Sequence, residues 1–220
     1  MPHGALAAEL RSAGDPGLLL PEEAQHLARA VPLRMQEFAA GRLCARRLLG
    51  EFGILDFPVK AAEDRQPLWP ESLVGSITHT AGFCAAVVAQ RRHVRAIGID
   101  CEVVGSVKAQ VWRSICLPQE VLWLHSLPDP EQAAAATLIF SAKEAFYKCQ
   151  YSLVRERLNF HDANVEVLDW GLSRGTFRLH ANRRIALADH AALPLQGRYL
   201  FHEHFVTAAI ALLAAQDLPQ

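Results

Sequence analysis

Two carboxylates stand two residues apart in the run GIDCE (98–102). The apolar residues around this run predict a β-strand over 94–103, in which alternate side chains share one face. Asp100 and Glu102 therefore point to the same side, and at about 4 Å, with an effective dielectric constant of about 20, they repel each other by about 4 kcal/mol. A divalent cation such as Mg²⁺, which prefers oxygen ligands, would relieve this repulsion. A solvated strand edge explains the same pattern, so both interpretations stay open.

A further acid lies in the run FSAKEAFYK (140–148). Residues 132–151 are rich in alanine and contain neither glycine nor proline, which predicts a long helix. Glu144 and Lys148 are four residues apart and so share one helix face. They form either an ordinary surface pair or a functional one, in which Glu144 is a metal ligand or base and Lys148 contacts a phosphate.

Several basic side chains lie on one predicted helix in the first quarter of the chain. Apolar spacing over 21–52 predicts two helices, interrupted at Pro32 and closed by Gly53. The second helix carries Arg34, Arg42 and Arg46. The last two are four residues apart, where like charges repel each other unless an anion lies between them. The alternative is a solvated basic face.

The segment DRQPLWP (64–70) contains two prolines, which forbid a helix and favour a rigid, extended loop. We expect this loop to present Arg65 and Trp69 outward.

Residues 74–90 predict two strands around the turn at Ala81-Gly82, and with the strand over 94–103 they make a small antiparallel β unit. Thr78 and His79 lie at the end of the first strand. A hydroxyl beside an imidazole can bind a phosphate, although a lone histidine is more often only a polar residue with a structural partner.

The remaining chain alternates between helical and strand-like patterns. Residues 107–127 have helical spacing, and 165–168, 176–179 and 200–213 have the composition of strands. His202 and His204 would share one face of the last strand, and we favour a surface strand over a zinc site because no third ligand is in view. Residues 79–87 weakly resemble 202–210, which allows a pair of related α/β lobes.

Composition excludes several classes of protein. The 220 residues are 51% hydrophobic and 20% charged, as in a globular protein, and 22 basic residues against 23 acidic ones give a net charge of −1. No overall field therefore attracts nucleic acid, and no stretch is apolar enough to cross a membrane. The five scattered cysteines form no Cys-x-x-Cys spacing, so we expect reduced thiols and a cytoplasmic location. Phosphate-binding loops, dinucleotide-binding turns and hydrolase elbows are all missing from the sequence.

Taken together and in this order, four segments resemble the 4′-phosphopantetheinyl transferases of the Sfp type, and within them the enterobactin-synthase branch. The segments are EFAAGRLCARRLL (37–49), DRQPLWPESLVGSITHTAG (64–82), IGIDCE (97–102) and FSAKEAFYKC (140–149). The resemblance implies an α+β monomer whose two similar α/β lobes are related by a pseudo-twofold axis, with coenzyme A bound between them. Residues 1–96 would bind the nucleotide, and residues 97–220 would carry the metal and the catalytic residues.

The activity that this resemblance implies is transfer of the 4′-phosphopantetheine group of coenzyme A to a serine of an apo acyl or peptidyl carrier protein, with release of adenosine 3′,5′-bisphosphate. By position, Asp100, Glu102 and Glu144 match the ligands of Mg²⁺, for which Mn²⁺ is an alternative. Glu144 and Lys148 match the catalytic residues. The residues expected to bind coenzyme A are Arg34, Arg42, Arg46, Arg65, Thr78, His79 and Lys148. Glu120 either lies near the metal, as in some members, or only begins a helix.

Two other functions remain open on the sequence: a non-catalytic regulator that binds coenzyme A or a carrier protein, and a metal-dependent phosphohydrolase. One departure from the family also affects the expected partner. Many members continue after the Lys148 position with Gly-x-Gly-Leu, whereas this chain has CQYSLV (149–154). The carrier preference of other members therefore does not transfer to this chain.

Overall fold

The computed structural model describes residues 2–27, 30–191 and 194–214. These residues form an α+β protein with a three-stranded and a five-stranded sheet, as the sequence predicts. The chain divides into two compact units. The first comprises the described residues of 1–97 together with 213–214, and the second comprises those of 98–212. The division into a nucleotide-binding part (1–96) and a catalytic part (97–220) stays a prediction.

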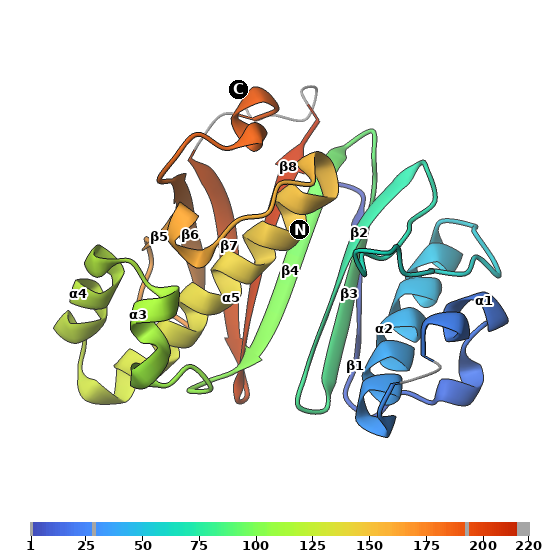
Figure 1. Cartoon of the computed structure of the whole chain (residues 1–220), viewed down its shortest axis with the longest axis horizontal. Coiled ribbons are helices and arrows are strands. Elements are labelled where there is room, and N and C mark those ends of the chain that lie inside the picture. Colours follow the sequence, from blue (N-terminus) through green and yellow to red (C-terminus); the bar gives the residue numbers. More distant parts are fainter. Residues whose placement is uncertain (1, 28–29, 192–193, 215–220) are drawn as a thin grey trace. The chain divides into compact units, whose positions relative to one another are not determined.

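The first unit is a long helix packed on a three-stranded antiparallel sheet (Figure 1). The strands are β1 (Ala5–Leu10), β2 (Leu73–Thr80) and β3 (Phe83–Gln90), in the order β1-β3-β2. The helix is α2 (Pro32–Glu51), preceded by the short α1 (Pro21–Ala24) and by 3₁₀ turns at Pro16–Leu18 and Gln25–Leu27. Gly41 lets α2 approach the sheet, because a Cβ there would lie 2.8 Å from Ile77 Cγ2.

Small and medium apolar side chains from α2, β2 and β3 fill the core of this unit. Its buried members are Ala40, Cys44, Ala45, Leu48, Leu49, Val59, Leu73, Cys84, Ala86 and Val88. Trp69 packs against the same cluster, and a Cβ on Gly75 would lie 2.6 Å from its ring. The expectation that Trp69 points outward is therefore wrong, because the bare backbone at Gly75 leaves room for the indole inside.

The second unit contains a five-stranded sheet in the order β4-β8-β7-β6-β5. Its strands are β4 (Val94–Val103), β5 (Ala163–Val167), β6 (Arg174–Ala181), β7 (Leu195–His202) and β8 (Phe205–Leu213). Its helices are α3 (Trp112–Ile115), α4 (Pro118–Ser126) and α5 (Asp129–Val154), with 3₁₀ turns at Ala109–Val111, Phe160–Asp162 and Ala186–Asp189. Figure 1 shows α5 lying along this sheet.

The closest approach of α5 to the sheet is at Gly98 of β4. A Cβ at this position would lie 1.9 Å from the carbonyl oxygen of Ala145 and 2.7 Å from the amide nitrogen of Cys149. Only glycine permits this contact without a shift of the backbone. It brings the carboxylates that follow Gly98 in β4 next to the middle of α5.

The long helix confirms the prediction over 132–151 and extends beyond it. The segment 149–154 contains no glycine, and α5 continues through it to Val154. The helix then ends at Arg155, which has a left-handed backbone (φ 57°). The segment that departs from the family's glycine-containing pattern is therefore helical in this chain.

Three sequence-based expectations about strands need correction. β4 does not join β2 and β3 in one small unit; it lies at the edge of the five-stranded sheet. The predicted strand over 200–213 is two strands, and Glu203 in the turn between them has a positive φ of 54°. His202 ends β7 and His204 lies in that turn, so the two histidines do not share a strand face. β1, which the sequence did not predict, pairs with β3.

The cysteines have the state that the sequence predicts. All five are buried, and the structure records each of them as a free thiol. Among the described residues, no helix is both long and apolar enough to cross a membrane.

Candidate active site

Three acids and one lysine of the second unit come together where β4 lies against α5. The ammonium Nζ of Lys148 donates a hydrogen bond to Asp100 Oδ1 at 2.7 Å and another to the carbonyl oxygen of Ile99 at 3.2 Å. Asp100 is only 4% exposed. Glu144 lies one helical turn before Lys148, and Glu102 is the next residue of β4 on the same face as Asp100. We call Asp100, Glu102 and Glu144 the acidic group.

The carboxylates of the acidic group affect each other's ionisation. Burial, then repulsion by Asp100 and Glu144, raises the pKa of Glu102 to about 7, although Lys148 opposes this shift. Burial, then repulsion by Asp100, also raises the pKa of Glu144. Three carboxylates thus share a single ammonium group, and an additional cation would stabilise their charged forms.

The acidic group offers the hard oxygen donors that Mg²⁺ prefers. As the side chains lie, however, no three His, Cys, Asp or Glu side chains in the described ranges are arranged to hold a metal ion. Lys148 already neutralises one oxygen of Asp100, and the mutual repulsion of the acids opposes a closer arrangement. The chemistry of the donors therefore fits a divalent cation, but the assignment of Asp100, Glu102 and Glu144 as its ligands stays a prediction.

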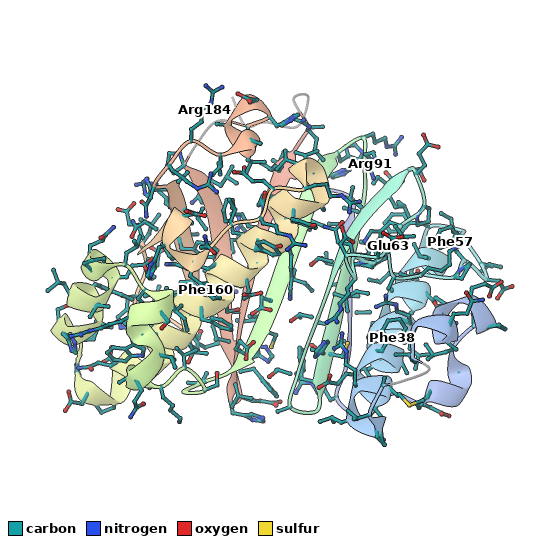
Figure 2. All side chains as sticks on the ribbon, viewed as in Figure 1. Phe38, Phe57, Glu63, Arg91, Phe160 and Arg184 are labelled. Atoms are coloured by element: carbon teal, nitrogen blue, oxygen red, sulfur yellow. The ribbon has the colours of Figure 1, made fainter. Side chains whose placement is uncertain are left out.

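Lys143, the residue before Glu144, forms a separate and buried ion pair. Its Nζ lies 2.7 Å from Glu120 Oε2, and both side chains are at most 2% exposed. Lys143 also donates to the carbonyl oxygens of Ile115 and Phe160, the second of which is labelled in Figure 2. Glu120 accepts from two backbone amides, those of Leu117 and Val165. Both oxygens of Glu120 are thus engaged, and the structure favours a fold-stabilising role for Glu120 over a place near the metal.

A cavity of about 450 Å³ opens beside Glu144. It lies between α5 and the segment 157–163, and its walls are partly aromatic and partly polar. Residues that line it include Glu144, Phe146, Tyr147, Leu158, Asn159 and Phe160. A slender ligand with both apolar and amide groups would match these walls.

In the first unit, α2 and the end of β2 bring together Arg34, Glu37 and His79. Arg34 Nη1 lies 2.6 Å from His79 Nε2, and Glu37 Oε2 lies 3.6 Å from His79 Nδ1 and 3.4 Å from Arg34 Nη1. All three side chains are partly exposed. The structure therefore brings together two of the residues predicted to bind coenzyme A, and it adds Glu37, which the sequence analysis did not single out.

Thr78 and His79 do not act as a side-chain pair. Successive residues of a strand point to opposite faces, and Thr78 is only 2% exposed whereas the side chain of His79 is 34% exposed. Two residues before His79, Ile77 touches α2 at Gly41, so His79 shares the face that packs against α2. Side-chain binding of one phosphate by both residues, as the sequence suggested, does not match this arrangement.

The anion near Arg42 and Arg46 is a carboxylate of the protein itself. Glu23 is fully buried, and it accepts hydrogen bonds from Arg46 and from the backbone amides of Leu20 and Val59. Arg46 also donates to the carbonyl oxygen of Leu18. Arg46 thus ties α2 to the N-terminal segment, and its prediction as a nucleotide ligand gains no support from the structure.

Arg42 is also largely buried. Its Nε donates to the carbonyl oxygen of Val59 at 2.8 Å, and its guanidinium lies 3.8 Å from the ring centroid of Phe38, labelled in Figure 2. Burial lowers its pKa to about 10, which the nearby Glu23 partly opposes. Its Nη2 is buried without a hydrogen-bond partner among the described residues. Arg65, by contrast, is exposed and has a left-handed backbone with a φ of 70°.

Two family models match nearly the whole chain. One is described as the 4′-phosphopantetheinyl transferase N-terminal domain and matches residues 22–89. The other is described as the 4′-phosphopantetheinyl transferase superfamily and matches residues 96–208.

Three relatives extend this similarity. The 4′-phosphopantetheinyl transferase Svp of Streptomyces mobaraensis is 38% identical over 90% of this chain and 80% of its own length. The 4′-phosphopantetheinyl transferase Npt of Nocardia iowensis is 32% identical over 96% of this chain and 97% of its own length. Enterobactin synthase component D of Escherichia coli (strain K12) is 36% identical over 70% of each chain.

Proposed function

The chain belongs to the 4′-phosphopantetheinyl transferase superfamily, and from this premise we propose how its own residues perform the transfer. The protein is an enzyme that moves the 4′-phosphopantetheine group of coenzyme A to a carrier protein. The observation that carries our assignment of the residues is the acidic group with Lys148, in which α5 and β4 bring three carboxylates around one ammonium.

Asp100, Glu102 and Glu144 are the residues that would hold Mg²⁺. Bound there, the ion would neutralise charge on the pyrophosphate of coenzyme A and polarise the phosphorus under attack. The raised pKa values of Glu102 and Glu144 support this role, since carboxylates that repel each other gain most from a cation. Lys148 would shift from Asp100 toward a phosphate oxygen, because an ammonium on a flexible chain can serve either partner.

The transfer itself exchanges one ester bond for another. The hydroxyl oxygen of the carrier serine forms a bond to the phosphorus that bears pantetheine, and the bond from this phosphorus to the bridging pyrophosphate oxygen breaks. Adenosine 3′,5′-bisphosphate leaves with the electron pair of the broken bond. Glu144 would accept the serine proton, either directly or through water.

The residues of the first unit would bind the nucleotide. The partly exposed side chains of Arg34 and His79 lie in contact, and Arg65 would add a cation from the exposed loop over 64–70. Arginine suits phosphate because its planar group donates several hydrogen bonds in a fixed geometry. Arg42, Arg46 and Thr78 are buried or engaged within the protein, so they would act mainly through the backbone that they hold in place.

The cavity beside Glu144 would take the pantetheine arm. This arm is slender and partly apolar, with amide groups along its length, and it matches walls that include Phe146, Leu158 and Asn159. Its place next to Glu144 would hold the reacting phosphorus close to the proposed base.

Finer features of the enzyme belong to the same proposal. We assign an acyl or peptidyl carrier protein as its partner, a monomeric state, and Mg²⁺ with Mn²⁺ as its alternative. The enterobactin-synthase branch is supported by the four motifs and by the similarity over 70% of component D. The similarity to Npt covers more of both chains, which favours a broader placement within the Sfp type.

The direct test is intact-mass analysis of an apo carrier protein after incubation with the enzyme, coenzyme A and Mg²⁺, against a panel of fatty-acid, polyketide and peptide carriers. We expect a carrier heavier by one phosphopantetheine and an equal amount of adenosine 3′,5′-bisphosphate. Release of 4′-phosphopantetheine without any carrier would support the phosphohydrolase instead. Tight binding of coenzyme A that is indifferent to Mg²⁺, with no modified carrier, would support the non-catalytic regulator.

A further inference from the structure

The contact between Arg34 and His79 fixes the protonation of the histidine as it lies in the structure. Arginine has no hydrogen-bond acceptor, so at 2.6 Å the guanidinium Nη1 donates and His79 Nε2 accepts. A ring nitrogen that accepts carries no proton. The proton of the neutral imidazole is therefore on Nδ1, the nitrogen that faces Glu37 Oε2 at 3.6 Å.

This arrangement changes when an anion arrives. A phosphate oxygen that approaches the pair attracts the guanidinium away from Nε2, and Nε2 can then bind a proton and donate to the same phosphate. The resulting imidazolium is stabilised on its far side by the carboxylate of Glu37. The side chains of Arg34, Glu37 and His79 are 46%, 29% and 34% exposed, so an anion can reach them from solvent.

We propose that Glu37 is a positioning residue, which holds the ring of His79 through Nδ1 and so allows Arg34 and a protonated His79 to clasp one phosphate group of coenzyme A. The proposal rests on the proposed function for the identity of the ligand. The role of Glu37 is its new element: this acid contacts no substrate, and it acts through His79.

Glu37 is an acid that faces the ring of His79, and other ionisable groups lie nearby. On α2, Arg42 lies two turns beyond Arg34, and repulsion between the two arginines contributes to the lowered pKa of Arg42. On β3, Cys84 pairs in register with His79. A hydrogen bond from Cys84 to Cys44, burial, and the nearby Glu37 all keep the thiol of Cys84 neutral by raising its pKa. Glu37 therefore balances Arg34 and His79, whereas the acid that acts on Arg42 is Glu23.

The experiment is calorimetric titration of coenzyme A, with Mg²⁺ present, into the wild-type protein and into Glu37→Gln, from about pH 6 to about pH 8.5, the range in which histidine titrates. We expect Glu37→Gln to bind coenzyme A about fivefold more weakly at neutral pH, the size typical of a partly exposed charge pair. Without Glu37 the imidazolium is less stable. As the pH rises, the affinity for coenzyme A should therefore begin to fall at a lower pH in Glu37→Gln than in the wild type. In steady-state assays KM for coenzyme A should rise while kcat stays unchanged.

Two further variants make the result specific. Glu51→Gln carries the same substitution on the exposed end of α2, about 20 Å along the helix at 1.5 Å per residue, and should bind like the wild type. His79→Ala removes the group that Glu37 positions, so adding Glu37→Gln to His79→Ala should have no further effect. An equal loss of affinity with and without His79 would show a merely structural role and overturn the proposal.

Unchanged affinity and an unchanged pH profile in Glu37→Gln would also overturn it. If the proposed function is wrong, the wild type modifies no carrier protein. The calorimetric comparison of Glu37→Gln with the wild type still tests the role of Glu37 in that case, because it measures binding of coenzyme A and not transfer. If the wild-type protein does not bind coenzyme A, both the proposal for Glu37 and the proposed function are wrong.

Discussion

The two units of the chain share one kind of helix–sheet packing but differ in the charge of the side chains beside it. Each packs one long helix on an antiparallel sheet, with a glycine at the contact: Gly41 of α2 touches β2, and Gly98 of β4 touches α5. In the first unit the acids Glu23 and Glu37 lie beside arginines. In the second unit three acids share Lys148.

This difference in charge indicates which kind of ligand would suit each unit. The proposed ligands differ accordingly: phosphate groups for the basic side chains of the first unit, and a divalent cation for the acidic group of the second. The fold supplies close helix–strand contacts, and residues of α2 in the first unit and of β4 and α5 in the second set the local charge.

We expect the largest effect from the loss of Glu144 in the acidic group of the second unit. Glu144→Gln removes both a proposed metal ligand and the proposed base, and general-base catalysis alone accounts for a factor of about 10²–10⁴ in rate. We expect transfer to fall by about this factor, measured as carrier modified per unit time. The circular-dichroism spectrum and melting temperature should match the wild type or exceed it slightly, since one repelling carboxylate is gone. Near-normal transfer would contradict the assignment.

Two lysines of α5 should have different roles: Lys143 in stability and Lys148 in activity. Lys143→Met leaves Glu120 buried and charged, which should lower the free energy of unfolding by about 3–5 kcal/mol. Lys148→Met, at a more exposed position on the same helix, should destabilise the fold much less but raise KM for coenzyme A and lower kcat. Urea unfolding and steady-state kinetics on both variants give the two readouts. A larger loss of stability in Lys148→Met than in Lys143→Met would contradict these roles.

Two arginines of the first unit should behave differently. Arg65 is exposed on its loop, so Arg65→Ala should raise KM for coenzyme A by about tenfold, the size of one charge-assisted phosphate contact, without altering stability. Arg46 is bonded to the buried Glu23, so Arg46→Ala should mainly lower the melting temperature. Equal effects of both substitutions on KM would show that Arg46 also serves the nucleotide.

The smallest expected effect is on stability as a function of pH. The folded-state pKa of Glu102, about 7, lies above its value of 4.5 in the unfolded chain, so folding favours the protonated carboxyl. This contribution to stability is fully present below about pH 4.5 and is lost as the pH rises through about 7. With a chelator present, Glu102→Gln should melt a few degrees above the wild type at about pH 8, corresponding to about 1 kcal/mol after solvent screening. Identical melting curves across this range would contradict the raised pKa.

Local patterns in the sequence predicted the elements that position the acidic group. The alternation in β4 placed Asp100 and Glu102 on one face, and the uninterrupted run in α5 placed Glu144 and Lys148 on another. Both patterns depend on neighbours within a few residues. The prediction of β2, β3 and their turn succeeded for the same reason.

What the sequence did not predict depends on contacts between distant residues. Glu23 lies 23 residues from Arg46, and Glu120 lies 23 residues from Lys143, so no local spacing signals either buried pair. The small residues of β1 gave no clear alternation, and its partners in β3 are more distant still in sequence, with Ala5 opposite Ala89. Glu37 had one usable signal, its position three residues after Arg34 on a helix, but its contact with His79 needs the strand beside it.

The most direct test of the central claim measures metal binding alone. Mn²⁺ can replace Mg²⁺ at oxygen sites and has a paramagnetic resonance signal that disappears when it binds. All measurements are made at saturating coenzyme A. We expect Arg65→Ala to bind Mn²⁺ with an affinity similar to that of the wild type. We expect Glu102→Gln to bind Mn²⁺ at least about tenfold more weakly, because a carboxylate ligand is lost. Undiminished Mn²⁺ binding by Glu102→Gln would contradict the claim that the acidic group holds the metal.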